Sequence, residues 1–219
     1  MLKKERYQHF VEHFSTKQPH AETELHYNNP YQLLVAVILS AQCTDKRINQ
    51  VTPALFQRFP NAKALAETTP DIVFDYIRSV SYPNNKAKHL VGMANMLLND
   101  FNDEVPSDIK ELQKMPGVGR KTANVIASVV YNEPAMAVDT HVFRVANRLG
   151  LTKGKTPLAV EKDLVKHLPE HTIAVAHHWL ILHGRYICVA RSPKCDICEL
   201  TYFCQYYEKI QKAKNMSKT

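Results

Sequence analysis

Apolar residues recur along almost the whole chain at the spacing of an α-helix. Segments of about ten to fifteen residues carry them at positions i, i+3, i+4 and i+7, and Pro, Asn or Gly separates one segment from the next. A half-buried strand needs sustained alternation of apolar and polar residues, which no stretch of the sequence shows. With only six glycines, a glycine-rich β architecture is also disfavoured. The pattern predicts an all-α protein.

Capping residues mark where several of these helices start and stop. Ser107 is expected to cap a short helix, and Asp108 and Glu111 suit the positive end of that helix. A later helix is expected to begin near Asp139 and to end at Gly150, which can adopt a left-handed backbone conformation.

Two other segments interrupt the pattern. Cys43 is expected inside an apolar, helix-like segment, where we interpret it as a small buried hydrophobic residue. Residues 81–85 are expected to form a loop, because Pro83 restricts the backbone of Tyr82 and cannot donate a backbone hydrogen bond.

A Pro-Gly-Val-Gly turn at residues 116–119 lies between two predicted amphipathic helices, the second over residues 122–131. Gly117 and Gly119 can take backbone angles closed to other residues, and they let a ligand approach the backbone closely. The amides at the start of the second helix would then suit a phosphate group. A plain tight turn is the alternative. The flanking helices and the Arg-Lys pair that follows favour a phosphate site.

Lys121 follows this turn directly and is a candidate nucleophile. The positive helix end, the neighbouring Arg120 and partial burial would each disfavour its charged form, and a neutral amine beside DNA can attack the sugar carbon C1′. Asp139 follows an apolar stretch and is the candidate acid–base partner, although it could simply be a helix cap. A lysine on a surface helix is usually a solvated charge, so the interpretation of Lys121 depends on the adjacent turn.

Four cysteines near the end of the sequence form a compact group with the spacing C-x6-C-x2-C-x5-C: Cys188, Cys195, Cys198 and Cys204. In a reducing compartment such a group points to metal binding rather than to disulfides. Zinc and an iron–sulfur cluster both suit four thiolates. Zinc sites more often use two separated C-x2-C pairs, and the single pair here favours a [4Fe-4S] cluster modestly.

The chain is basic, with 28 Lys and Arg residues against 21 Asp and Glu residues and a net charge of +7. Such a balance favours a polyanionic partner, although many basic proteins bind no nucleic acid. The longest apolar run, residues 33–39, is far shorter than the ~20 residues of a membrane-spanning helix, and the N-terminus lacks the apolar stretch of a secretory signal. We therefore expect a cytoplasmic protein with no membrane partner, associated with the nucleoid if it is bacterial.

Four motifs together give the chain a close resemblance to the endonuclease III family, the bifunctional DNA glycosylase/AP lyases of the helix-hairpin-helix superfamily. The motifs occur in the family's order and extend over nearly the whole chain: LSAQCTD at 39–45, PGVGRKTAN at 116–124, VDTHVFRV at 138–145 and HHWLILHGR at 177–185.

The resemblance implies two helical lobes. One is a bundle over residues 22–133 that contains the helix-hairpin-helix at about residues 107–131. The other combines residues 1–21 with 134–219 and holds a [4Fe-4S] cluster on the four cysteines. It also implies a protein that acts on double-stranded DNA containing damaged pyrimidines or abasic sites. The sequence does not give the oligomeric state, and a monomer is the default expectation.

The resemblance also implies the chemistry. Lys121 would attack C1′ of an extruded oxidised-pyrimidine nucleotide, and β-elimination through the resulting Schiff base would cut the strand, with Asp139 in the acid–base role. Gln42 would fill the gap left by the extruded base, and Tyr82 stands where relatives often carry a Gly-Leu-Tyr wedge. The residues expected to contact DNA are Gln42, Asp45, Tyr82, Gly117, Val118, Gly119, Arg120, His141, Arg191 and Lys194.

Two other functions remain open from the sequence. A monofunctional adenine-mispair glycosylase of the same superfamily shares the hairpin and the cysteine spacing, but such relatives usually lack a lysine at position 121 and carry a further C-terminal domain. A non-catalytic DNA-binding module would need neither Lys121 nor Asp139.

Overall fold

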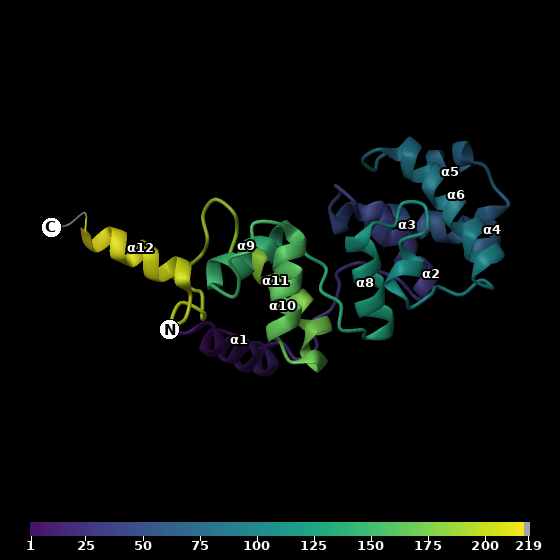
Figure 1. Ribbon diagram of the computed structural model, residues 1–219. Coiled ribbons are helices and arrows are strands. Elements are labelled where there is room, and N and C mark those ends of the chain that lie inside the picture. The colour runs from purple at the N-terminus through teal and green to yellow at the C-terminus, as the bar shows by residue number, and fades with distance from the viewer. Residues whose placement is uncertain (217–219) are drawn as a thin grey trace. The chain divides into compact units, whose positions relative to one another are not determined.

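The computed structural model describes residues 1–216, and every regular element in this part of the chain is a helix (Figure 1). The prediction of an all-α protein is confirmed. The chain divides into two compact units. The hairpin unit is Thr23–Glu133, and the cysteine unit combines Met1–Glu22 with the residues from Pro134 onward.

The hairpin unit is built around one buried helix, α2 (Pro30–Ser40), which packs against three of its neighbours, α3, α6 and α8. Asn29 caps α2 by accepting a hydrogen bond from the backbone N–H of Gln32, and Pro30 occupies the first helical position. Residues 32–39 are all buried, as expected for a helix that is apolar on every side. The remaining helices of the unit are α3 (Asp45–Arg58), α4 (Ala62–Ala66), α5 (Pro70–Ile77), α6 (Pro83–Asp100), α7 (Ile109–Leu112) and α8 (Arg120–Tyr131).

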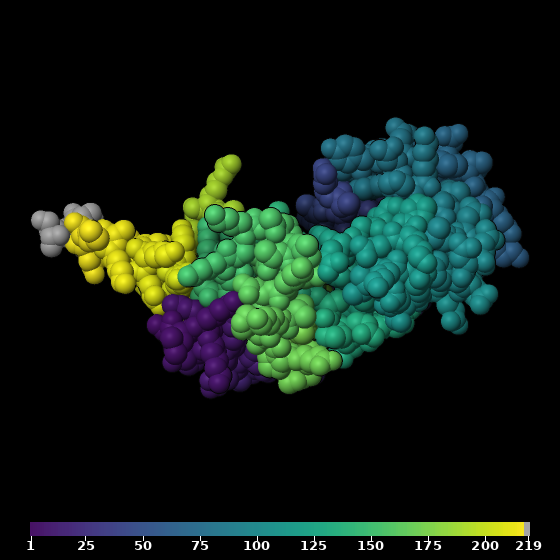
Figure 2. Space-filling view, in the orientation of Figure 1, coloured from purple at the N-terminus to yellow at the C-terminus, as the bar shows by residue number. Residues whose placement is uncertain are grey.

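The cysteine unit places the N-terminal helix against the C-terminal third of the chain. Phe10 and Phe14 of α1 meet Trp179 of α11 in one aromatic cluster, and the Trp179 indole N–H donates to the Gln18 carbonyl at 2.7 Å. Figure 2 shows the first residues, in purple, lying against later residues drawn in green. The helices of the unit are α1 (Lys3–Lys17), α9 (Thr140–Leu149), α10 (Pro157–His167), the 3-10 helix η1 (Glu170–Thr172), α11 (Ile173–Tyr186) and α12 (Gln205–Met216).

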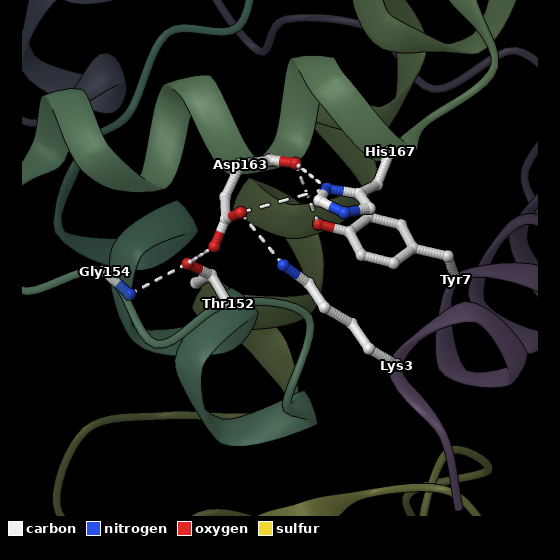
Figure 3. A network of polar contacts seen from close by, with 6 residues as sticks. All are labelled: Lys3, Tyr7, Thr152, Gly154, Asp163 and His167. Carbon is white, nitrogen blue, oxygen red and sulfur yellow. Dashed lines mark hydrogen bonds and ion pairs between the residues drawn. The ribbon is translucent and has the colours of Figure 1, made fainter.

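A polar network centred on Asp163 of α10 fastens α1 in place (Figure 3). The Asp163 carboxylate accepts hydrogen bonds from Lys3 Nζ at 2.9 Å and from Thr152 Oγ1 at 2.7 Å. Its backbone carbonyl accepts a hydrogen bond from the Tyr7 hydroxyl at 3.2 Å and lies 2.7 Å from His167 Nδ1. These contacts join the start of the chain to residues far along the sequence.

Three local predictions are wrong. Asp108, not Ser107, caps α7, because the Asp108 carboxylate accepts hydrogen bonds from two backbone N–H groups of the first turn. Pro83 begins α6 instead of continuing a loop, since proline suits the first position of a helix. Cys43 lies in the short loop between α2 and α3 and is only partly buried.

Candidate active site and metal centre

The hairpin turn between α7 and α8 has the backbone geometry of an exposed ligand-binding loop. Gly117 has φ +80°, and a Cβ at this position would lie 3.0 Å from His89 Cβ, so glycine is required on two grounds. Val118 is buried and anchors the turn, and its N–H donates to the Met115 carbonyl at 3.1 Å.

Gly119 differs from the expectation. Its φ of −84° is open to any residue, so it does not supply a special backbone angle. A Cβ at Gly119 would meet nothing within 4 Å, and the residue is exposed. Gly119 therefore keeps the surface beside the start of α8 clear, where backbone N–H groups of the first turn lack intrahelical acceptors.

Lys121 lies in the first turn of α8, directly after the turn. Its side chain is exposed, and so is that of Arg120, so the expected partial burial of Lys121 is wrong. The exposed amine is adjacent to the positively polarised helix end that can bind a phosphate.

Asp139 caps α9 and is partly buried. Its Oδ1 accepts a hydrogen bond from the Val142 N–H at 2.7 Å, after a fully buried stretch at residues 135–138. His141, in the same first turn, lies with Nδ1 3.2 Å from a guanidinium nitrogen of Arg144. Asp139 and His141 thus belong to the cysteine unit, whereas Lys121 belongs to the hairpin unit.

Gln42 and Tyr82 lie on two loops that the structure brings together. The Ser81 hydroxyl donates a hydrogen bond to the Gln42 carbonyl at 2.8 Å. Both side chains are exposed, and Asp45 follows on the first turn of α3. The pairing of these loops has no local signal in the sequence.

The four C-terminal cysteines line one small pocket between α9, α11 and α12. Cys188 and Cys204 are buried, and Cys195 and Cys198 are partly buried. Within the part of the chain that the structure describes, no three donor side chains form a site for a single metal ion.

Comparison with known proteins decides the family. The model of the HhH-GPD superfamily of base excision DNA repair proteins matches residues 35–170, and the iron–sulfur binding domain of endonuclease III matches residues 188–204. Endonuclease III of Rickettsia felis is 49% identical over 194 residues, which cover 89% of this chain and 91% of the relative. The chain belongs to the endonuclease III family.

Other relatives agree. Endonuclease III of Escherichia coli K12 is 43% identical over 192 residues, covering 88% of this chain and 91% of the relative. A solved structure of a trapped endonuclease III–DNA covalent intermediate matches with a TM-score of 0.90 and 42% identity, covering 96% of this chain and 100% of that chain. The protein is thus a base excision repair enzyme, a DNA glycosylase and AP lyase, and the two alternative functions are not favoured.

The cofactor of this endonuclease III family member is a [4Fe-4S] cluster, and the donor set fits it. The matched iron–sulfur domain begins at Cys188 and ends at Cys204. Burial raises the pKa of the Cys198 thiol to about 11 and also raises those of Cys195 and Cys204. Because a thiol binds iron as the thiolate, cluster binding must release the protons of these cysteines.

Two arginines of α9 hydrogen-bond to the segment that begins at Cys188, and the sequence did not reveal either role. Arg148 donates to the carbonyls of Val189 at 2.8 Å and Ala190 at 2.7 Å, and to Cys188 Sγ at 3.4 Å. Arg144 donates to the Cys188 carbonyl at 3.1 Å and to the Gly184 carbonyl at 2.8 Å. Their spacing of four residues places both on one face of α9, but it does not indicate which distant groups they contact.

The segment after Cys188 presents two of the predicted DNA contacts. Arg191 and Lys194 are both exposed, and the Lys194 N–H donates to the Ile187 carbonyl at 3.0 Å. Arg148 thus fixes the start of the same loop that carries these two cations.

No helix in the described residues could cross a membrane.

Proposed function

We propose that this protein removes oxidised pyrimidines from duplex DNA and cuts the resulting abasic site by β-elimination, with Lys121 as nucleophile and Asp139 as acid–base partner. The observation that supports the proposal most strongly is the exposed amine of Lys121 on the first turn of the helix that follows an open, glycine-containing turn.

The hairpin turn binds the DNA backbone in this proposal. Gly119 leaves room for a phosphate, and the first-turn amides of α8 supply donors to it. Arg120 adds a positive charge at the same helix end. This contact places the strand within reach of Lys121 while reading no base sequence.

Lys121 then performs the chemistry. Its amine nitrogen bonds to C1′ of the extruded nucleotide as the bond from C1′ to the base breaks, and the base leaves with a proton. The amine loses its proton and the sugar ring opens, giving a Schiff base. Removal of a proton from C2′ expels the 3′ phosphate and cuts the strand. The exposure of Lys121 supports this role, since a buried amine could not reach the sugar.

Asp139 moves protons during these steps and stabilises positive charge that develops on the sugar. Its carboxylate is held by the Val142 N–H and is partly shielded from water, which supports an electrostatic role.

The remaining predicted contacts position the DNA. Gln42 and Tyr82 occupy the gap in the base stack, with Asp45 near the lesion and His141 near the backbone. Cys188, Cys195, Cys198 and Cys204 would hold the cluster, which when bound supplies a rigid anchor and no chemistry on the substrate. Arg191 and Lys194 then meet phosphates. We propose further that the protein acts as a monomer in the compartment that holds the cell's DNA, which is the cytoplasm if the source is bacterial.

Borohydride trapping on abasic duplex DNA tests the nucleophile. Only a Schiff base is reduced to a stable covalent adduct, so the wild type should form one and Lys121→Ala should lose it by about a thousandfold or more. Lys114→Ala, which removes an exposed lysine ion-paired with Glu111, is the matched control and should trap normally. An undiminished adduct in Lys121→Ala would exclude this lysine.

Base release tests the acid and the lesion. Duplexes with thymine glycol or an adenine mispair are compared under single-turnover conditions. Thymine glycol should be released and the adenine retained. Asp139→Asn should slow the release of thymine glycol about a hundredfold while leaving DNA affinity unchanged. An unchanged release rate in this variant would remove Asp139 from the mechanism.

A further inference from the structure

Gln42 and Tyr82 share an unusual backbone conformation. Of the five non-glycine residues with positive φ among residues 1–216, three are Asn or Asp, which adopt this conformation readily: Asn102, Asp103 and Asn132. The other two are Gln42, with φ 56°, and Tyr82, with φ 55°. A left-handed conformation costs such residues about 1 kcal/mol or more, so neighbouring contacts must hold it in place.

Both strained residues point their side chains into solvent. Gln42 is exposed in the loop between α2 and α3, and Tyr82, at 62% exposure, directly precedes α6. Neither side chain is needed to fill the core. The strained backbone therefore directs an amide side chain and an aromatic ring into solvent from two adjacent loops.

Ser81 links the two loops. Its hydroxyl donates to the Gln42 carbonyl at 2.8 Å, and its Oγ lies 3.8 Å from Cys43 Sγ. A bond to the carbonyl of a strained residue restricts rotation of that peptide. Ser81 thus fixes the backbone of Gln42 to the residue next to Tyr82.

Lys86 provides a second link from beneath. It is only 6% exposed, and its ammonium donates to the carbonyls of Leu39 at 2.8 Å and Ala41 at 2.6 Å. These are carbonyls at the end of α2, where backbone acceptors lack helical partners. Lys86 itself lies in the first turn of α6, next to Tyr82.

The placement of Lys86 is costly for the fold. Lysine is rarely buried, burial lowers the pKa of this amine, and a cation is disfavoured at the positive end of a helix. An apolar residue would fill the space at lower cost, but it could not tie the end of α2 to the start of α6.

We propose that Ser81 and Lys86 are positioning residues that preset Gln42 and Tyr82 as one fixed two-residue probe, which enters the base stack as the damaged nucleotide leaves it. The inference rests on the proposed function, in which both probe residues contact DNA at the lesion. The flat ring of Tyr82 stacks on the bases beside the gap, and the amide of Gln42 meets the hydrogen-bonding edge of the unpaired base. Because the backbone of the pair is held in advance, less loop ordering opposes extrusion.

The test compares a lesion paired with a base, which extrusion leaves unpaired, with the same lesion opposite a position that has no base. Single-turnover release of thymine glycol is measured opposite adenine and opposite a spacer that lacks a base. Ser81→Ala and Lys86→Met should slow release about tenfold opposite adenine and less than about twofold opposite the spacer. A purely structural role predicts equal slowing on both duplexes, and that result, or no slowing on either, overturns the inference.

Two further variants isolate the hydrogen bonds. Ser81→Thr keeps the hydroxyl and should restore most of the rate on the paired duplex. In a Gln42→Ala background the probe amide is gone, so adding Ser81→Ala should slow release by less than about twofold. Full additivity of the two substitutions would show that Ser81 does not act through Gln42.

The experiments also distinguish a failure of this inference from a failure of the proposed lesion. If the wild type leaves thymine glycol intact, the lesion assignment fails, and strand cleavage at an abasic site in duplex and in single-stranded DNA carries the same comparison. If Lys86→Met does not fold by circular dichroism, Ser81→Ala, which removes one hydroxyl near the surface, decides alone.

Discussion

The hairpin unit and the cysteine unit hold their functional residues by different means. In the hairpin unit, Lys121 and the turn before it lie at the start of a helix whose inner face is buried, so backbone geometry and the buried Val118 position them. In the cysteine unit, the segment between α11 and α12 contains no helix, and the two arginines of α9 and the thiol pocket hold it. The hairpin unit therefore holds its functional residues with protein contacts alone, whereas the cysteine unit also depends on a cofactor.

Loss of the cluster should have the largest effect, and only on the cysteine unit. Cys198→Ala should strongly reduce cluster content, measured by iron content and visible absorbance, because one iron loses its thiolate ligand. Limited proteolysis should then cut between residues 189 and 203, while residues 23–133 stay resistant. Cys43→Ala is the matched control and should keep a full cluster, since Cys43 lies in the hairpin unit. Rapid digestion of the hairpin unit in Cys198→Ala would contradict the independence of the two units.

In the hairpin unit, two glycine substitutions should separate stability from binding. Gly117→Ala should destabilise the unit by about 1–2 kcal/mol in urea denaturation, because of its positive φ and the contact with His89. Gly119→Ala should destabilise the unit less, because its φ is negative and its Cβ meets nothing within 4 Å, leaving only the weaker N-cap preference of alanine. It should nevertheless weaken DNA binding severalfold, since the added Cβ would occupy the space proposed for a phosphate. Equal stability of the two variants would refute the geometric distinction.

Arg148→Met should affect the cysteine segment without removing a cysteine. The variant loses bonds to two carbonyls and to Cys188 Sγ, as well as a contact 4.6 Å from the Tyr206 ring centroid. Hydrogen exchange at residues 189–194 should become faster, and DNA affinity should fall about tenfold. Arg191→Ala is the control, because it should weaken binding to a similar degree while leaving exchange unchanged.

The smallest effect concerns acid stability. Burial, reinforced by Arg185, lowers the pKa of His178 to about 4, so the folded protein keeps this histidine neutral while the unfolded chain protonates it below about pH 6.5. The unfolded state then binds more protons, and stability is lost as the pH falls from 6.5 towards 4, by at most about 1.4 kcal/mol per pH unit. His178→Asn should reduce the slope of stability against pH in denaturation curves between pH 7.5 and 5.5, with the remainder from the similarly shifted His183, whereas exposed His20→Asn should leave it unchanged.

The sequence predicts those features that depend on residues close together in the chain. The Asp139 cap, the Gly150 stop with φ +82° and the cysteine spacing are all local patterns, and the structure places the first two as predicted. Asp108 was mistaken for a first-turn residue because Ser107 is an equally good cap by type.

Long-range contacts lay beyond that reasoning. Nothing near Lys86 indicates that its ammonium binds carbonyls at the end of α2, and nothing near Arg148 indicates that it holds residues 189–190. Such side chains look like ordinary surface charges until the fold supplies their acceptors. The proposed roles of Lys121 and Asp139 came from the adjacent turn and helix start together with the family resemblance, which composition alone could not supply.

The first helix shares its core with residues from the last third of the chain, which has a consequence for biosynthesis. On the ribosome, residues 23–133 can fold as soon as they emerge, whereas the N-terminal helix must wait until Asp163 and Trp179 have been translated. The thiols follow later still. Cluster insertion would therefore be the last step of maturation. A shortage of iron or sulfide should leave a full-length chain in which residues 23–133 are folded and the cysteine unit lacks its cluster.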